Sequence, residues 1–267
     1  MHAWCPARRD RQAGLMILHG TEAGAGPPVV LLHGLFGSSG NFSAVQRALA
    51  AKHRVVAFDL RNHGASPHDP AMTYAGMAAD VLDSMADRGI PAAAVLGHSM
   101  GGKTAMRMAL LAPERISRLV VADIAPVAYR HNNRAVADAM LALPLRPGLT
   151  RGEADAMLAP EVPEPGVRGF LLQNLRPGAG PSWRIALPEI SAALPAIEGW
   201  DAPDASYPGP VLVVRGERSD FVSPDNRAAF RHPFPAARFV TLRNAGHWLH
   251  ADAPAAFIQT VSAFLDA

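Results

Sequence analysis

The chain has 267 residues, about half of them hydrophobic, which is enough to bury the core of one large domain. Its 25 basic and 23 acidic residues give a formal net charge of +2 and are spread along the whole length, so no basic arm or stripe for nucleic acid stands out. The single cysteine, Cys5, excludes an internal disulfide and a thiolate zinc site.

The sequence also contains no apolar run near the roughly 20 residues that span a bilayer. Residues 1–14 carry charge but lack the apolar core of a secretory signal, and we interpret them as a frayed terminus. We therefore expect a cytoplasmic protein without nucleic-acid or membrane partners. The sequence leaves its oligomeric state, monomer or dimer, open.

From Pro28 onward, short apolar runs alternate with helical patterns, which is typical of a mostly parallel sheet with helices on both faces. Strand-like segments lie at 29–34, 54–60, 92–99, 118–126, 210–216 and 237–242. Helical patterns cover 42–52, 74–88, 100–111, 224–230 and 254–265. Between Pro126 and Pro208 proline and glycine recur around short helical pieces at 133–143 and 167–175. We predict an α/β core of residues 1–126 and 209–267 with an inserted helical cap subdomain of residues 127–208.

The motif that carries most information is GHSMGG at 97–102, which follows a strand and precedes a helix. This is the context that a G-x-S-x-G nucleophile elbow requires. A serine hydroxyl is a weak nucleophile, so it must be lifted clear of the sheet and placed at a helix N-terminus, near a base. The motif predicts Ser99 as the nucleophile.

The same segment, GHSMGGKT at 97–104, also matches the phosphate-loop pattern G-x-x-x-x-G-K-[ST], with Lys103 in the position that holds a phosphate. Against a nucleotide-binding protein stand the late position of the segment and the serine in elbow register. A further argument against it is that two other parts of the chain carry hydrolase motifs.

One of these is HGLFGS at 33–38, at the end of a buried strand. Acyl transfer needs two N–H donors aimed at the oxyanion, one after the nucleophile and one from this earlier loop. We assign these donors to the backbone amides of Met100 and Leu35. His33 and Gly34 are expected to shape the loop.

The other is AGHW at 245–248, after the last predicted strand. In enzymes with a nucleophile elbow of this kind, the histidine that acts as the base comes last along the chain, after the serine and the acid. This order points to His247. The rival, His250, falls where a helix begins, and we expect it to contact solvent.

The acid has two candidates. The usual place after the preceding strand, in RGERSDFVSP at 215–224, holds Ser219, and Asp220 lies one residue out of register. Asp123, at the end of the neighbouring strand, could reach the same imidazole. We favour Asp123 with Ser219 as a supporting partner, and Asp220 stays open.

Together, HGLFGS, DLRNHGASPH at 59–68, GHSMGGKTAM at 97–106 and DIAPVAY at 123–129 resemble the YbfF-like esterases and their eukaryotic abhydrolase-domain relatives. The resemblance runs from about Val29 to the C-terminus. It implies the α/β-hydrolase fold, which we expect as a mostly parallel eight-stranded sheet with helices on both faces and a helical cap inserted before strand seven. It also implies a triad of serine, histidine and an aspartate after strand six, matching Ser99, His247 and Asp123.

The resulting hypothesis is a serine carboxylesterase that hydrolyses short-chain acyl esters through an acyl-enzyme, without metal or cofactor. Thioester cleavage, perhydrolysis and C–C bond hydrolysis run on the same elbow and stay open as alternatives. So does a non-enzymatic ligand-binding protein, although the complete set of site residues argues against it. In the RNHG segment we expect Arg61, Asn62 and His63 to tie a loop beside the elbow and to take no part in the chemistry.

Overall fold

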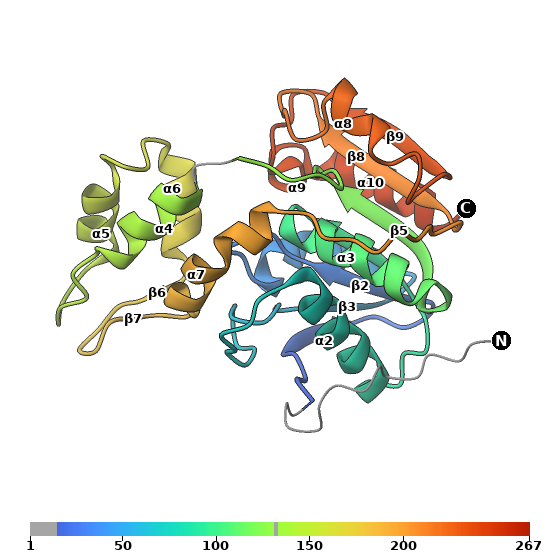
Figure 1. The fold of residues 1–267 in the computed structure, drawn as a ribbon. Helices are drawn as coiled ribbons and strands as arrows, with labels where there is room; N and C mark the ends of the chain where they lie inside the picture. Colours follow the sequence, from blue (N-terminus) through green and yellow to red (C-terminus); the bar gives the residue numbers. More distant parts are fainter. Residues whose placement is uncertain (1–14, 131–132) are drawn as a thin grey trace.

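The computed structural model describes residues 15–130 and 133–267 (Figure 1). The interpretation of residues 1–14 lies outside the described part of the chain. The strands are β1 (Gly20–Ala23), β2 (Pro28–Leu32), β3 (Arg54–Phe58), β4 (Ala93–His98), β5 (Ile116–Ala122), β6 (Leu175–Arg176), β7 (Ser182–Trp183), β8 (Val211–Gly216) and β9 (Ala237–Leu242). The helices are α1 (Ser43–Leu49), α2 (Tyr74–Asp87), α3 (Met100–Leu111), α4 (Asn133–Leu141), α5 (Arg151–Leu158), α6 (Pro165–Leu172), α7 (Leu187–Glu198), α8 (Pro224–Ala228), α9 (Leu249–Asp252) and α10 (Pro254–Leu265), with 3-10 turns η1 (Ser39–Phe42) and η2 (Pro113–Arg115).

The main sheet has the strand order β1-β3-β2-β4-β5-β8-β9, and only β1 runs antiparallel to its neighbour. Its central strands are apolar on both faces, because each face is covered by helices. Helices α2 and α3 pack on one face and α1 and α10 on the other (Figure 1). The mostly parallel α/β sheet with helices on both faces is thus confirmed.

The expectation of eight strands is wrong for the described residues, where the main sheet has seven. Among the described residues only β1 precedes β2. Just before β1 the His19 carbonyl accepts from the Asp59 amide at 2.9 Å, but the backbone amides there bond to side chains. The Leu18 amide donates to the Ser84 hydroxyl and the His19 amide to the Ser66 hydroxyl, both at 2.9 Å.

Helices α4 to α7 and the small hairpin β6–β7, here called the insertion, come between β5 and β8. In Figure 1 α4, α5 and α6 lie to one side of the sheet, and α7 leads the chain back towards α3. The parallel strands end at the same edge of the sheet, where binding sites of open α/β sheets form. No helix in residues 15–130 or 133–267 is both long and apolar enough to cross a bilayer.

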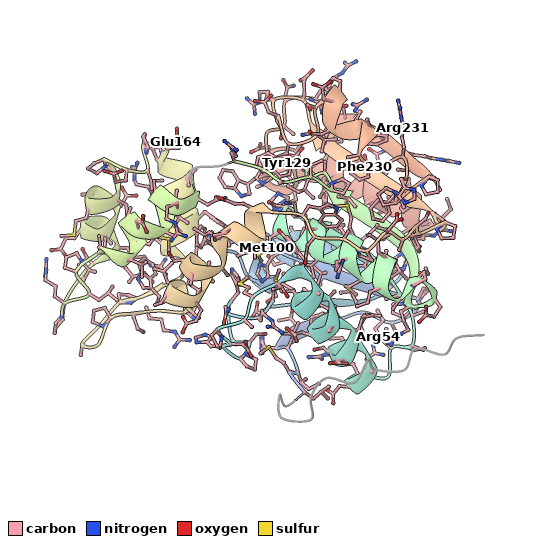
Figure 2. The ribbon with its side chains drawn as sticks, viewed as in Figure 1. Arg54, Met100, Tyr129, Glu164, Phe230 and Arg231 are labelled. Carbon is pink, nitrogen blue, oxygen red and sulfur yellow. The ribbon has the colours of Figure 1, made fainter. Side chains whose placement is uncertain are left out.

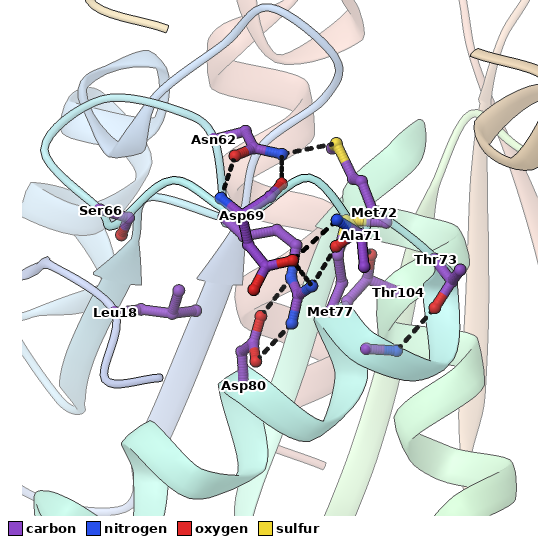
Figure 3. Close-up of polar contacts among 12 residues, drawn as sticks. Leu18, Asn62, Ser66, Asp69, Ala71, Met72, Thr73, Met77, Asp80 and Thr104 are labelled. Carbon is purple, nitrogen blue, oxygen red and sulfur yellow. Dashed lines mark hydrogen bonds and ion pairs between the residues drawn. The ribbon is translucent and has the colours of Figure 1, made fainter. Parts of the chain in front are cut away.

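The RNHG segment at 61–64 is fixed by its own polar side chains (Figure 3). The Arg61 guanidinium donates twice to the buried Asp80 carboxylate of α2, at 2.6 and 2.7 Å, and once to the Ala71 carbonyl. Asn62 exchanges two hydrogen bonds with the Asp69 backbone, at 2.9 and 2.8 Å. These contacts agree with the structural role expected for this segment.

Besides His247, several histidines lie at the carboxyl edge of the sheet. His33, His63 and His98 are buried, and burial lowers the pKa of His33, that of His63 to about 3, and that of His98 well below its usual value. They are therefore neutral, and each can accept through one ring nitrogen and donate through the other.

His250 is half-buried: it keeps some contact with solvent, as expected, but its ring also packs against other rings. Its ring lies 5.0 Å from that of Phe42 and 4.9 Å from that of His98, and its Nδ1 is buried without a partner. The reason is that α9 packs against α10 and places position 250 towards η1. Burial lowers the pKa of His250 to about 4.

Loss of the Asp80 charge should destabilise the fold. Asp80→Asn removes the buried carboxylate that the Arg61 guanidinium bonds twice and leaves it only the more exposed Asp69 carboxylate at 3.7 Å, and we expect the free energy of unfolding to fall by roughly 3 kcal/mol. Urea denaturation followed by circular dichroism measures it. Asp87→Asn, at the exposed end of the same helix, is the control and should change stability by less than about 0.5 kcal/mol. Equal effects of the two substitutions would contradict this assignment.

Stability should also fall in mild acid. Unfolded His250 takes a proton near pH 6.5, whereas folded His250 does so near 4, so stability is lost as pH falls from 6.5 towards 4. Each such histidine contributes up to about 1.4 kcal/mol per pH unit. In His250→Leu the loss between pH 7 and pH 5 should shrink by about 2 kcal/mol, measured by urea denaturation at both pH values. An unchanged loss would show that His250 is already protonated in the folded protein.

Candidate active site

Ser99 lies in the sharp turn between β4 and α3, with backbone angles φ 52° and ψ −118°. A non-glycine residue rarely adopts a positive φ, and here neighbouring contacts impose it. The Ser99 amide donates to the Ala122 carbonyl of β5, and the Lys103 amide donates to the Ser99 carbonyl, both at 3.0 Å. The turn therefore presents the serine at the N-terminus of α3.

The two motif glycines on either side are required by close backbone approach. A Cβ at Gly97 would lie 2.1 Å from the Gly101 carbonyl oxygen. A Cβ at Gly101 would lie 2.2 Å from the Leu32 carbonyl oxygen of β2. The G-x-S-x-G spacing thus lets the helix start directly against the strand ends.

His247 and Asp123 form a hydrogen-bonded pair although 124 positions separate them. His247 Nδ1 lies 2.8 Å from Asp123 Oδ2, and the Asp123 carboxylate is fully buried. Asp123 follows β5 directly and also has a positive φ, of 54°. Its other oxygen, Oδ1, accepts from the Gly216 amide at 2.9 Å.

Of the residues after β8, the structure brings Ser219 and not Asp220 to this pair. The buried Ser219 hydroxyl donates to Asp123 Oδ2, the oxygen that also faces His247. Asp220 is exposed. The Asp123 carboxylate therefore receives bonds from three different segments, and this arrangement holds it in place.

Two contacts that the sequence did not reveal fix the loop and ring of His247. The buried His98 imidazole contacts the His247 carbonyl through Nε2 at 2.8 Å, and the two rings lie 4.7 Å apart. The Phe221 ring stacks on the His247 imidazole, with centroids 3.8 Å apart and an interplanar angle of 15°. The only sequence signal for the first contact was the position of His98 beside the nucleophile.

The loop after β2 directs the Leu35 amide. The Leu60 amide donates to His33 Nε2 at 2.9 Å, so the proton of this neutral ring is on Nδ1, which donates to the Gly34 carbonyl at 2.8 Å. The Gly37 amide donates to the same carbonyl at 3.0 Å. Because the peptide is planar and trans, holding the Gly34 carbonyl also sets the direction of the Leu35 N–H on its opposite side.

Ser99, His247, Leu35 and Met100 all line one cavity of about 330 Å³ at the carboxyl edge of the sheet. Met100 is the first residue of α3, where backbone amides have no intrahelical partner. In Figure 2 Met100 lies between the sheet and the insertion. No hydrogen bond joins the Ser99 hydroxyl to the His247 imidazole among the described residues, although both side chains reach the same cavity.

The rest of the cavity wall is mostly apolar. Its lining comes from the core and from the insertion and includes Phe36, Ile124, Val136, Val167, Phe170, Leu171, Ile197, Phe221 and Trp248. The other polar side chains of the wall are Asn41, Tyr74, Lys103, Tyr129, Asn133 and Glu198, with the histidines His33, His98 and His250. An apolar wall with a few polar groups suits a small, largely apolar ligand.

Lys103 is buried below this cavity and does not lie in a phosphate loop. Residues 100–111 form α3, and the Lys103 ammonium donates to the Glu198 and Gly199 carbonyls at 3.2 and 2.6 Å. It also lies 4.9 Å from the centre of the Tyr129 ring. Burial lowers the pKa of Lys103 to about 7. In a phosphate loop, successive backbone N–H groups form a concave anion-binding site. In this protein the corresponding residues form the elbow turn and the first turn of a regular helix.

The residues that the structure describes include no group of three or more His, Cys, Asp or Glu side chains placed to hold a metal ion. The charged side chains nearest the serine are accounted for by bonds within the protein. Asp123 bonds to His247, Ser219 and Gly216, and Lys103 bonds to backbone carbonyls.

Comparisons with known proteins place this geometry in a family. Residues 27–254 match the family model described as "alpha/beta hydrolase fold". The chain is 38% identical to the protein named Esterase YbfF of Escherichia coli, over 90% of this chain and 93% of that protein. It is 39% identical to the mouse protein named sn-1-specific diacylglycerol lipase ABHD11, over 90% of this chain and 81% of the relative.

Among solved structures, one titled "Marine microorganism esterase" superimposes with a TM-score of 0.90 at 32% identity. It covers 93% of this chain and 99% of that one. The resemblance inferred from the sequence motifs is therefore confirmed, and the chain belongs to the α/β-hydrolase fold family.

Proposed function

We propose that this protein is a serine carboxylesterase that hydrolyses short-chain acyl esters. The observation that carries the proposal is the Asp123–His247 pair at 2.8 Å, facing the same cavity as a serine held in a strained turn. The names of the relatives, an esterase and a lipase, support the same reaction class.

In this mechanism Ser99 is the nucleophile and His247 the base. His247 takes the Ser99 proton through Nε2 as the hydroxyl oxygen attacks the ester carbonyl, and then returns it to the departing alkoxide. Water, deprotonated by the same imidazole, releases the acid from the acyl-enzyme and restores Ser99. The Asp123 carboxylate keeps the proton of neutral His247 on Nδ1 and stabilises the imidazolium that forms.

The developing oxyanion is bound by the Leu35 and Met100 amides. His33 and Gly34 support the first donor through the bonds that set the Gly34–Leu35 peptide plane. The second donor is the first amide of α3, whose dipole also favours negative charge at this end. Neither a metal nor a cofactor takes part in this sequence of steps.

Residues 127–208 act as the cap over this site in our proposal, with residues 1–126 and 209–267 as the core. Val136, Val167, Phe170 and Leu171 of the insertion line the cavity beside core residues, which supports that division. A volume of about 330 Å³ is at the small end of ligand pockets, which favours short acyl chains in a small-molecule ester. We further propose a cytoplasmic location.

Thioester cleavage, perhydrolysis and C–C bond hydrolysis could use the same serine, since each reaction begins with attack on, or stabilisation of, a carbonyl. The cavity described above gives none of these reactions a specific advantage over ester hydrolysis. A panel of p-nitrophenyl esters from acetate to decanoate, with matched acyl thioesters, ranks the two classes. Higher kcat/KM on thioesters would replace the esterase assignment.

Ser99→Ala should abolish hydrolysis of p-nitrophenyl butyrate, because no other hydroxyl lies in the elbow. The expected loss exceeds about 10⁵ in kcat. A fluorophosphonate probe should label the wild-type chain and not the variant, and thermal unfolding should show that the variant folds. Turnover retained by a folded Ser99→Ala protein would overturn the proposal.

Asp123→Asn should reduce kcat by about 10⁴, since the amide would favour the wrong tautomer of His247. Asp220→Asn is the matched control, because the same change is made on an exposed side chain nearby. Its kcat should stay within about twofold of wild type. The opposite ranking, measured with p-nitrophenyl butyrate at pH 8, would transfer the acid role to Asp220.

A further inference from the structure

Phe36 is held in a left-handed backbone conformation beside the proposed oxyanion donor. Its φ is 58°, which is unfavourable for a bulky residue without outside support. Phe36 follows Leu35 directly, so the peptide between them includes the Leu35 carbonyl and the Phe36 amide. The next peptide joins the Phe36 carbonyl to the Gly37 amide, and that amide donates to the Gly34 carbonyl at 3.0 Å. Any relaxation of Phe36 towards negative φ would therefore disturb one of the two bonds that direct the Leu35 amide.

Both backbone polar groups of Phe36 are bound by buried side chains. Its amide donates to His63 Nε2 at 3.1 Å, and its carbonyl accepts from Asn174 Nδ2 at 2.7 Å. His63 Nδ1 lies 2.9 Å from the Arg61 carbonyl, so the proton of this neutral ring is on Nδ1 and its Nε2 accepts. Phe36 is thus clamped between one core side chain and one side chain of the insertion.

Asn174 is itself fixed in orientation. It lies between α6 and β6, and its amide nitrogen is also 3.3 Å from the Leu171 carbonyl, so Nδ2 faces two acceptors. The backbone carbonyl of Asn174 accepts from the Arg184 amide across the hairpin at 2.8 Å. The buried Asn174 side chain, whose backbone and amide group are both held by these bonds, therefore contacts the loop after β2 in a fixed orientation.

A second contact joins the end of the same hairpin to the same part of the core. The Ala186 amide donates to the Asn62 carbonyl at 2.9 Å, one residue before His63. The insertion therefore contacts the core at two points. Asn174 bonds to Phe36 itself, and Ala186 bonds to the RNHG segment that carries His63.

We propose that Asn174 is a positioning residue that couples docking of the insertion to assembly of the oxyanion site. The inference rests on the proposed function and deepens it. With the insertion in place, the Asn174 amide holds the Phe36 carbonyl, Phe36 keeps its positive φ, and the Leu35 N–H stays aimed at the oxyanion. When the insertion moves away, this donor is withdrawn, the Phe36–Gly37 peptide is no longer held from that side, and the Leu35 amide loses one of its two supports, while the His33 bond to the Gly34 carbonyl remains.

Asn174→Asp and Asn174→Leu test this coupling. The first replaces the donor by a carboxylate that repels the Phe36 carbonyl, and the second removes the donor at similar volume. We expect kcat for p-nitrophenyl butyrate to fall about tenfold, less than the about 10² to 10³ for losing an oxyanion donor outright. KM should stay within about twofold, since the lost interaction acts on the transition state. Gln173→Glu and Gln173→Leu, on the exposed neighbouring residue, should match wild type.

A transition-state analogue separates positioning from mere support of the fold. An alkyl trifluoromethyl ketone, whose carbonyl is attacked by Ser99 to give a bound hemiketal oxyanion, should lose affinity in parallel with kcat, also about tenfold. An unchanged kcat in folded Asn174→Leu would overturn the proposal, as would a higher KM at constant kcat or an unchanged inhibition constant. Loss of the cooperative thermal transition in both variants would overturn it too, by assigning Asn174 to folding alone.

Ser99→Ala, measured in parallel, distinguishes failure of this inference from failure of the proposed function. An inactive Ser99→Ala protein beside fully active Asn174 variants would reject only the coupling. Turnover by Ser99→Ala would reject the esterase mechanism itself, whatever the Asn174 variants do.

Discussion

The buried carboxylate of Asp123 is the constraint on which the rest of the site depends. A charge without solvent is costly unless bonded from several sides, and here the Gly216 amide, the Ser219 hydroxyl and the His247 imidazole all point to it. These partners come from β8, the loop after it and the loop after β9. The order of neighbouring strands β5, β8 and β9 in the sheet is therefore what allows one carboxylate to orient a histidine so distant in sequence.

Backbone strain gathers at the same edge of the sheet. The non-glycine residues with positive φ among those described are Phe36, Asn62, Ser99, Asp123 and Asn244. Three of them belong to the proposed catalytic machinery or its support: Ser99, Asp123 and Phe36. Such conformations persist only when surrounding contacts over-determine them, as the bonds to Ser99, Asp123 and Phe36 do. The strained backbone conformations cost free energy, but they hold hydrogen-bond donors and acceptors in fixed positions. Such preorganised groups stabilise a transition state electrostatically.

Much of the core was predictable because its signals are local. The start and end of α3 and α10 follow from glycine, serine and proline at their ends, and both match the expected bounds. The six strand-like segments all contain strands; five are short apolar runs that are mostly buried, and β9, at the edge of the sheet, is only partly buried. The strand count was wrong because, among the described residues, only β1 precedes β2 in the main sheet, and just before it the Leu18 and His19 amides bond to side-chain hydroxyls. The ring contacts of His250 could not be predicted, because they depend on how α9 packs and not on its neighbours in sequence.

By itself, the sequence determined the fold class, the elbow serine, the donor loop and the late histidine, because each is encoded by residue types at short spacing. Only the tertiary structure brought Asp123 and not Asp220 to His247, stacked Phe221 on the imidazole and joined Asn174 to Phe36. The physical reason is that these contacts bridge segments up to 138 positions apart. Their geometry is set by the strand order and by the docking of the insertion. A local pattern of residues predicts neither of these.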